Sequence, residues 1–166
     1  MATVHLQGNA VNTSGDLPAK GASAPDFKLT NGELKDKTLS DFAGKKKVLN
    51  IFPSVDTPTC ALSVKQFNNH AAQHSDVVML QISADLPFAQ GRFCGDNGLE
   101  NVETLSMMRD RSFAQDYGTL LVDGPLAGLS ARAVVVLDEN NSVLHSQLVN
   151  EIADEPDYEA ALASLG

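Results

Sequence analysis

The sequence contains few of the residues from which many functional sites are built. Its 166 residues include two cysteines and no tryptophan, and 12 Lys and Arg stand against 21 Asp and Glu, for a formal net charge of −9. Two cysteines are too few for a disulfide-rich secreted scaffold or for a structural zinc site of the usual kind. The acidic balance argues against nucleic acid or an anionic membrane surface as a partner. The two thiols are therefore the first candidates for chemistry.

Long apolar runs are also missing. No stretch reaches the roughly 18 consecutive apolar residues of a membrane span. The N-terminal segment Met1–Gly8 lacks the charged start and apolar core of a secretory signal. We therefore expect a cytoplasmic protein with no membrane partner. Ordinary thiols stay reduced in that compartment, so a disulfide there would be transient rather than structural.

The pattern along the chain predicts one domain of the α/β class over residues 1–166, because chains divide into separate cores only well beyond this size. Short apolar runs typical of buried strands alternate with segments of helical periodicity, and a hairpin and a helix close the chain. This order indicates a sandwich with a mixed central sheet flanked by helices. The expected strands cover 48–52, 77–82, 102–105, 132–137 and 143–149, and the expected helices about 60–74, 88–94, 111–117 and 156–165.

Two segments outside this pattern carry further expectations. Residues 1–15 are expected to form an N-terminal β-hairpin extension, with its turn at Gly8-Asn9. The run Lys45–Lys47 is interpreted as a solvated basic step ahead of a strand and is given no functional role.

Cys60 stands at the first turn of the helix expected after the strand 48–52. Unpaired backbone N–H groups and the positive end of the helix dipole stabilise an anion at such a place. A thiol there ionises more easily, and the thiolate is the nucleophile. Most free cysteines, however, are small buried hydrophobes. Position alone leaves both interpretations of Cys60 open.

The residues before Cys60 favour the reactive interpretation. Thr57 lies where a thioredoxin-type Cys-x-x-Cys motif would have its first cysteine. A hydroxyl there removes dithiol exchange within the motif but keeps a hydrogen-bond partner for the sulfur or for a bound oxygen. Pro53 ends the strand and stiffens the loop around the thiol. A threonine near a helix start is also a common cap, so Thr57 alone decides little.

At this point the sequence resembles the peroxiredoxins. Pro53, Thr57 and Cys60 stand at the offsets of the Pro-x-x-x-Thr-x-x-Cys signature of that family, and Arg132 matches its distant arginine at the start of a late strand. The resemblance is closer still to the bacterial thiol peroxidases, a subgroup of this family. Its members have an N-terminal hairpin and a second cysteine in the helix after the second core strand. Cys94 occupies that place.

The resemblance implies a thioredoxin-like fold and a mechanism without a cofactor or metal. Cys60 would be the peroxidatic nucleophile, attacking hydrogen peroxide or an alkyl hydroperoxide to give a sulfenic acid. Arg132 and Thr57 would hold the thiolate and the peroxide, and Pro53 would shield the thiol from water. Cys94 would be the resolving thiol, forming an intrachain Cys60–Cys94 disulfide. The resemblance also implies thioredoxin as reductant and a homodimer.

Two other interpretations stay open from the residues. The thiol pair could belong to a redox sensor or binding module with slow turnover, although a sensor has no evident need for Thr57 and Arg132 together. The chain could also be a structural domain with two inert thiols. His70 and His74 have the i, i+4 spacing of a metal-binding helix, but no Glu completes the motif, so we expect a solvated face and no metal.

Overall fold

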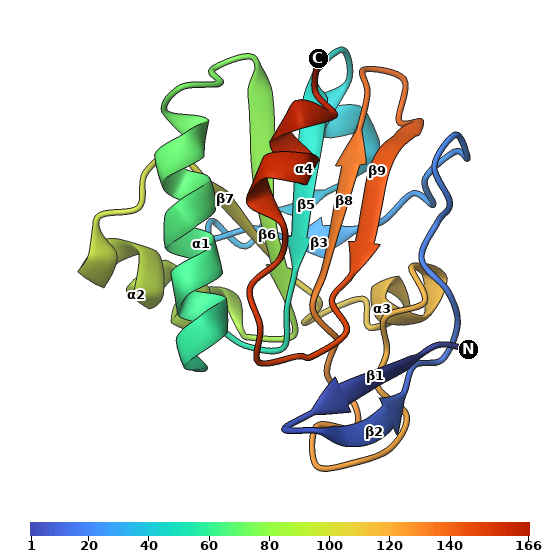
Figure 1. The fold of residues 1–166 in the computed structure, drawn as a ribbon. Helices are drawn as coiled ribbons and strands as arrows, with labels where there is room; N and C mark the ends of the chain where they lie inside the picture. The colour runs from blue at the N-terminus through green and yellow to red at the C-terminus, as the bar shows by residue number, and fades with distance from the viewer.

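The computed structural model describes all residues from Met1 to Gly166, and a mixed sheet forms its centre (Figure 1). The seven strands lie in the order β4-β3-β7-β6-β5-β8-β9. Strands β5, β6 and β7 are parallel, whereas β8 is antiparallel to β5, and β9 to β8. The strands are β3 (Leu29–Thr30), β4 (Asp36–Lys37), β5 (Lys46–Ile51), β6 (Val77–Ser83), β7 (Glu103–Ser106), β8 (Ala133–Leu137) and β9 (Val143–Leu148).

Helices cover both faces of the sheet because successive side chains of a buried strand point to opposite sides. On β5, Val48 packs with Phe67 of α1 and Ala161 of α4. Leu49 points the other way, into the cluster that contains Phe113 of α3. Figure 1 accordingly shows α1 and α4 in front of the sheet, and α3 near the lower end of β9. The helices are α1 (Pro58–Ala71), α2 (Pro87–Asn97), α3 (Ser112–Asp116) and α4 (Tyr158–Ala163), with a 3-10 turn, η1, at Leu39–Phe42.

The predicted N-terminal hairpin is present as β1 (Thr3–Leu6) and β2 (Asn9–Asn12). It lies at the end of the sheet where α1 begins (Figure 1). The backbone N–H of His5 donates to the carbonyl of Asn150 at 2.7 Å, and that of Ile152 donates to His5 at 2.8 Å. The hairpin is therefore joined to the segment that follows β9.

The turn of this hairpin differs from the prediction by one residue. Leu6 pairs with Asn9, so Gln7 and Gly8 are the central residues rather than Gly8 and Asn9. Their φ angles of 52° and 81° are both positive, as a two-residue type I′ turn requires. Gln7 adopts the left-handed conformation that Asn adopts more readily.

The expectation that Lys45–Lys47 is a solvated step is wrong for Lys47. Strand β5 begins earlier than predicted, at Lys46, and this places the Lys47 side chain inside the protein. Its Nζ donates to Asn141 Oδ1 at 2.5 Å, in the loop between β8 and β9. Burial lowers the pKa of Lys47. The polar pattern of the sequence concealed this strand residue because its partner comes from a distant loop.

Candidate active site

The sequence folds so that Cys60 lies in the first turn of α1, directly beyond the carboxyl end of β5. Thr57 is the N-cap residue of α1 and Pro58 is its first residue, where the fixed φ of proline suits a helix start. The Cys60 side chain is fully buried and packs with Phe52, Val55 and Val64. The predicted placement at a helix start is therefore confirmed, and the thiol lies in an apolar environment.

Arg132 contacts the Cys60 sulfur directly. Its Nη2 donates to Sγ at 3.1 Å, and its Nε donates to the carbonyl of Ile152 at 2.8 Å. The guanidinium is 1% exposed, and the carboxylates that form ion pairs do so with other cations. A buried charge is costly unless an anion or several acceptors compensate it. A Cys60 thiolate is the anion that this arrangement accommodates.

One donor of Arg132 remains free. Nη1 is buried and has no hydrogen-bond partner within the protein. Arg132 is also one of the residues that line a cavity of about 130 Å³, together with Pro53, Thr57 and the apolar side chains of Leu6, Leu126 and Ile152. A buried donor without a partner is uncommon in native structures and calls for an explanation such as a ligand. A small molecule with an oxygen acceptor and an apolar substituent fits this cavity.

The hydroxyl of Thr57 has a defined direction. Thr57 Oγ1 donates to the carbonyl of Ser54 at 2.9 Å. Because a hydroxyl has one proton and two lone pairs, this bond leaves the lone pairs of Thr57 as acceptors. The cavity is therefore lined by one residue with a free acceptor, Thr57, and one with a free donor, Arg132.

Cys94 lies on a different helix, and both cysteines are free thiols. It is half-buried near the end of α2, and burial raises its pKa. The neighbouring Phe93 packs against the cluster that contains Cys60. The structure thus places Cys94 on an element that touches the surroundings of Cys60, without a bond between the two sulfurs.

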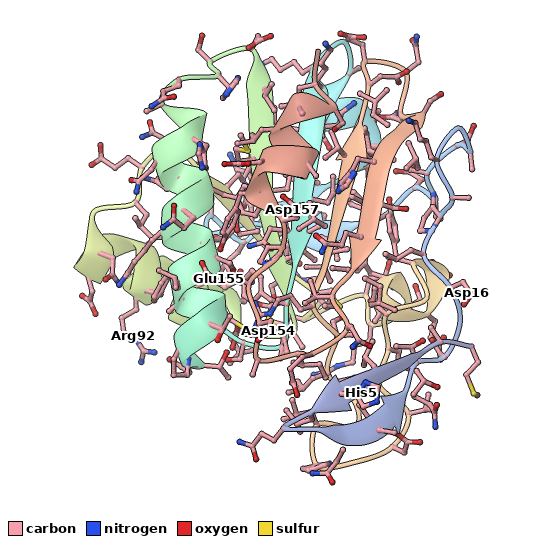
Figure 2. All side chains as sticks on the ribbon, viewed as in Figure 1. His5, Asp16, Arg92, Asp154, Glu155 and Asp157 are labelled. Atoms are coloured by element: carbon pink, nitrogen blue, oxygen red, sulfur yellow. The ribbon has the colours of Figure 1, made fainter.

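Charged side chains surround this end of the molecule (Figure 2). Arg92 of α2 forms an exposed ion pair with Asp56, its Nη2 lying 3.3 Å from Oδ1. This pair connects the helix of Cys94 to the loop before Cys60. Asp154, Glu155 and Asp157 follow one another on the segment that leads into α4 (Figure 2). Thr59 of α1 donates to the carbonyl of Ala153 at 2.7 Å, so this acidic segment starts next to the site.

Several residues of the site were missed by the sequence prediction. Leu6, Leu126 and Ile152 line the cavity, yet each is an ordinary apolar residue in its own segment. Asp85 was also missed: its carboxylate accepts from Ser54 and from Val55 in the loop before Cys60. A polar residue two positions after β6, the strand beside β5, was a usable signal, because the ends of adjacent parallel strands meet at one edge of the sheet.

The expected histidine pair does not share a helix. α1 ends at Ala71, so His70 lies in its last turn and His74 lies beyond it. The His70 ring lies 6.3 Å from that of Tyr158. No group of three or more His, Cys, Asp or Glu side chains has the arrangement of a metal site. No helix has the length and apolar character required to cross a bilayer.

Comparison with known proteins places this geometry in context. Residues 19–162 match the family model described as Redoxin. The chain is 55% identical over 166 residues to a thiol peroxidase of Mycobacterium bovis, covering 100% of this chain and 99% of the relative.

Solved structures show the same similarity in three dimensions. A peroxiredoxin-like protein from Aquifex aeolicus superposes with a TM-score of 0.90 at 36% identity, covering 99% of this chain and 96% of the other. A thiol peroxidase from Chromobacterium violaceum superposes with a TM-score of 0.91 at 27% identity, covering 98% and 94% of the two chains.

Proposed function

The chain belongs to the Redoxin family as a thiol peroxidase of the peroxiredoxin type, and from this premise we propose that Cys60 is its peroxidatic nucleophile. The observation that carries the assignment is the contact of Arg132 Nη2 with Cys60 Sγ at 3.1 Å. Arg132 also lines the cavity, and its Nη1 has no partner within the protein. Cys94 has no such cation and burial raises its pKa, which disfavours its thiolate in this conformation.

The first chemical step is a displacement at oxygen. The Cys60 thiolate attacks the terminal oxygen of a hydroperoxide, so an S–O bond forms and the O–O bond breaks. Sulfur loses two electrons and becomes a sulfenic acid, while the leaving oxygen takes up a proton and departs as water or an alcohol. Negative charge builds on the leaving oxygen during this step, and the free Nη1–H of Arg132 suits that charge.

Thr57 and Pro53 position and shield the peroxide and the thiolate before the O–O bond breaks. With its proton committed to Ser54, the Thr57 hydroxyl accepts the hydrogen of the incoming peroxide and orients the oxygen that is attacked. Pro53 is buried and lines the cavity, where it excludes water from the sulfur. Together these groups hold the peroxide in line with Sγ before the reaction begins.

Cys94 is the resolving thiol in this proposal. Its sulfur attacks the sulfenic sulfur, an S–S bond forms, and hydroxide leaves and is protonated to water. A disulfide requires Cα atoms within roughly 7 Å. Because Cys60 is fully buried and Cys94 lies on another helix, we propose that local unwinding brings the two sulfurs together. A dithiol of the thioredoxin class then reduces the Cys60–Cys94 disulfide by exchange, which returns both thiols.

The lining of the cavity bears on the substrate. Beside the polar atoms of Thr57 and Arg132, the walls contain Leu6, Leu126 and Ile152. These side chains stabilise an apolar substituent, so we propose organic hydroperoxides as substrates together with hydrogen peroxide. We also propose a cytoplasmic location and a homodimer, on the basis of the family resemblance.

The experiment that tests the proposal couples peroxide consumption to thioredoxin, thioredoxin reductase and NADPH. The wild-type protein should consume NADPH continuously, and Cys60→Ser should abolish turnover. Cys94→Ser should react once with peroxide, stop at the sulfenic acid and overoxidise more readily. Full turnover by Cys60→Ser would disprove the nucleophile assignment. A wild-type protein that oxidised once and never recycled would instead support the redox-sensor interpretation.

A further inference from the structure

Asp85 connects three parts of the molecule that surround the cavity. It lies between the end of β6 at Ser83 and the start of α2 at Pro87. Its Oδ1 accepts from the Ser54 hydroxyl at 2.6 Å, and its Oδ2 accepts from the Val55 N–H at 2.9 Å and from the Ser83 hydroxyl at 2.6 Å. Three donors thus converge on one half-buried carboxylate.

The main chain of Asp85 is itself fixed to the sheet. Its carbonyl accepts from the hydroxyl of Ser106, the last residue of β7, at 2.5 Å. The Ser83 hydroxyl that binds Asp85 also accepts from the amide of Gln90 in α2 at 3.0 Å. The carboxylate therefore reaches the loop before Cys60 from a rigid edge of the sheet.

The hydrogen bond from Val55 to Asp85 holds the Ser54–Val55 peptide, whose carbonyl accepts the hydrogen bond from the Thr57 hydroxyl. The N–H of Val55 and the C=O of Ser54 belong to one planar group and point in opposite directions. Asp85 binds the N–H side at 2.9 Å, and the Thr57 hydroxyl donates to the C=O side at 2.9 Å. A rotation of this peptide plane would turn the Thr57 hydroxyl away from its present direction.

We propose that Asp85 is a positioning residue of the peroxide step. By holding the Ser54–Val55 peptide plane, its carboxylate aims the acceptor lone pairs of Thr57 into the cavity beside Arg132. The inference rests on the proposed role of Thr57 and Cys60. It adds to that role a residue that touches neither peroxide nor sulfur.

The donors around Asp85 favour a carboxylate over an amide. An ionised aspartate offers only acceptors, which matches the two hydroxyl donors and the N–H donor around it. An asparagine of the same size presents an NH2 group to at least one of these donors. In Asp85→Asn the Ser54–Val55 peptide is therefore held less firmly, while the volume of the side chain is conserved.

The test compares Asp85→Asn with Thr57→Val, with the double variant and with Asp110→Asn as a matched control. Asp110 also accepts from a serine hydroxyl and a backbone N–H, those of Ser112, and lies outside the site. All four are made in the Cys94→Ser background, so that only Cys60 reacts. Quenched-flow mass spectrometry measures the rate constant of Cys60 oxidation by an alkyl hydroperoxide. Alkylation by iodoacetamide reports access to the same thiolate without using the Thr57 acceptor.

We expect Asp85→Asn to slow oxidation of Cys60 by about 10- to 100-fold, the range for a misplaced catalytic group. The rate of alkylation should stay within about twofold of the parent, because iodoacetamide does not use the Thr57 acceptor and is insensitive to its position. Thioredoxin reduction of the disulfide, measured with Cys94 present, should also be unchanged. The double variant should lose little more than Thr57→Val alone, since groups that act through one another are not additive.

Three results would overturn the proposal. The first is oxidation of Asp85→Asn at the parent rate, and the second is an effect that adds in full to that of Thr57→Val. The third is a joint fall in the rates of oxidation, alkylation and reduction. If Asp85→Asn does not fold, Ser54→Ala decides the matter: it removes one donor to the carboxylate and should slow oxidation alone by a few-fold. A Cys60→Ser protein with full turnover would refute the proposed function instead, so the two failures are distinguishable.

Discussion

The Arg132 guanidinium has a different environment at each nitrogen. Nε is satisfied by the carbonyl of Ile152, Nη2 contacts Cys60 Sγ, and Nη1 has no partner in the protein. In the proposed mechanism the bond of Nε orients the group, Nη2 stabilises the Cys60 thiolate, and Nη1 donates to the peroxide. In a chain with a net charge of −9, one buried cation thus supplies the positive charge at the sulfur.

The first prediction concerns this residue. Arg132→Met should slow oxidation of Cys60 by about 10²- to 10³-fold, because a preorganised donor to the developing charge is lost. Reduction of the Cys60–Cys94 disulfide by thioredoxin should change little, since that step does not use the peroxide site. Separate rapid-mixing measurements of the two half-reactions test this, with the exposed Arg111→Met as control. A variant with slow reduction and normal oxidation would contradict the placement of Arg132.

At the scale of elements, the two parts of helix α2 differ in burial. Its buried residues, Pro87 and Gln90, lie near its start, and none of the residues from Gly91 to Asn97 is fully buried. Gly91 and Gly95 both fall within this second part, and glycine lowers helix stability. We therefore expect the part of α2 that carries Cys94 to unwind most easily, and this is the motion that the proposed disulfide formation would use.

The second prediction tests this motion. Gly95→Ala should favour the helix by about 1 kcal/mol and so slow disulfide formation by about fivefold. An added Cβ meets nothing within 4 Å at Gly95, so no clash confuses the result. Alkylation of the remaining thiols after quenching, followed by mass spectrometry, measures the rate. Overoxidation of Cys60 should begin at lower peroxide concentration.

Gly32→Ala is the matched control, because its Cβ also meets nothing within 4 Å and the residue lies outside any helix. It should leave disulfide formation at the wild-type rate. An unchanged rate in Gly95→Ala would show that unwinding of α2 does not limit the resolving step.

At the scale of the whole molecule, the cavity is assembled from segments that are distant in the sequence. Leu6 comes from the hairpin, Thr57 from the start of α1, and Arg132 from the residue before β8. Ile152 follows β9 and is joined by its N–H to His5 of the hairpin. The N-terminal extension is thus a wall of the site, although the two largest apolar clusters contain none of its residues.

The third prediction follows from this wall. Leu6→Ala should lower kcat/KM for a bulky organic hydroperoxide by about 5- to 30-fold, as expected when a leucine contact worth about 1–2 kcal/mol is lost. Hydrogen peroxide has no apolar substituent, so its kcat/KM should stay within about twofold. Leu34→Ala, an exposed leucine outside the cavity, is the control. Equal losses for both peroxides would indicate that Leu6 supports the fold and not the substrate.

Features that depend on residues close together in the chain were predictable. Pro53, Thr57 and Cys60 lie within one loop and one helical turn, so their spacing alone indicated a thiol at a helix start. Strand and helix periodicities are equally local, and they yielded the mixed sheet and the N-terminal hairpin. Boundaries moved by a few residues, as at β5, because a strand end depends on its neighbours in the sheet.

The sequence by itself therefore determined the fold class, the two scarce thiols and the signature around Cys60. Only the tertiary structure decided that Arg132 reaches Sγ, that Leu6 closes the cavity, and that Lys47 is buried. It also brought Asp85 to the peptide that directs Thr57. The physical reason is that hydrogen-bond direction and burial are set by pairing between distant segments, whereas a sequence pattern records only neighbours along the chain.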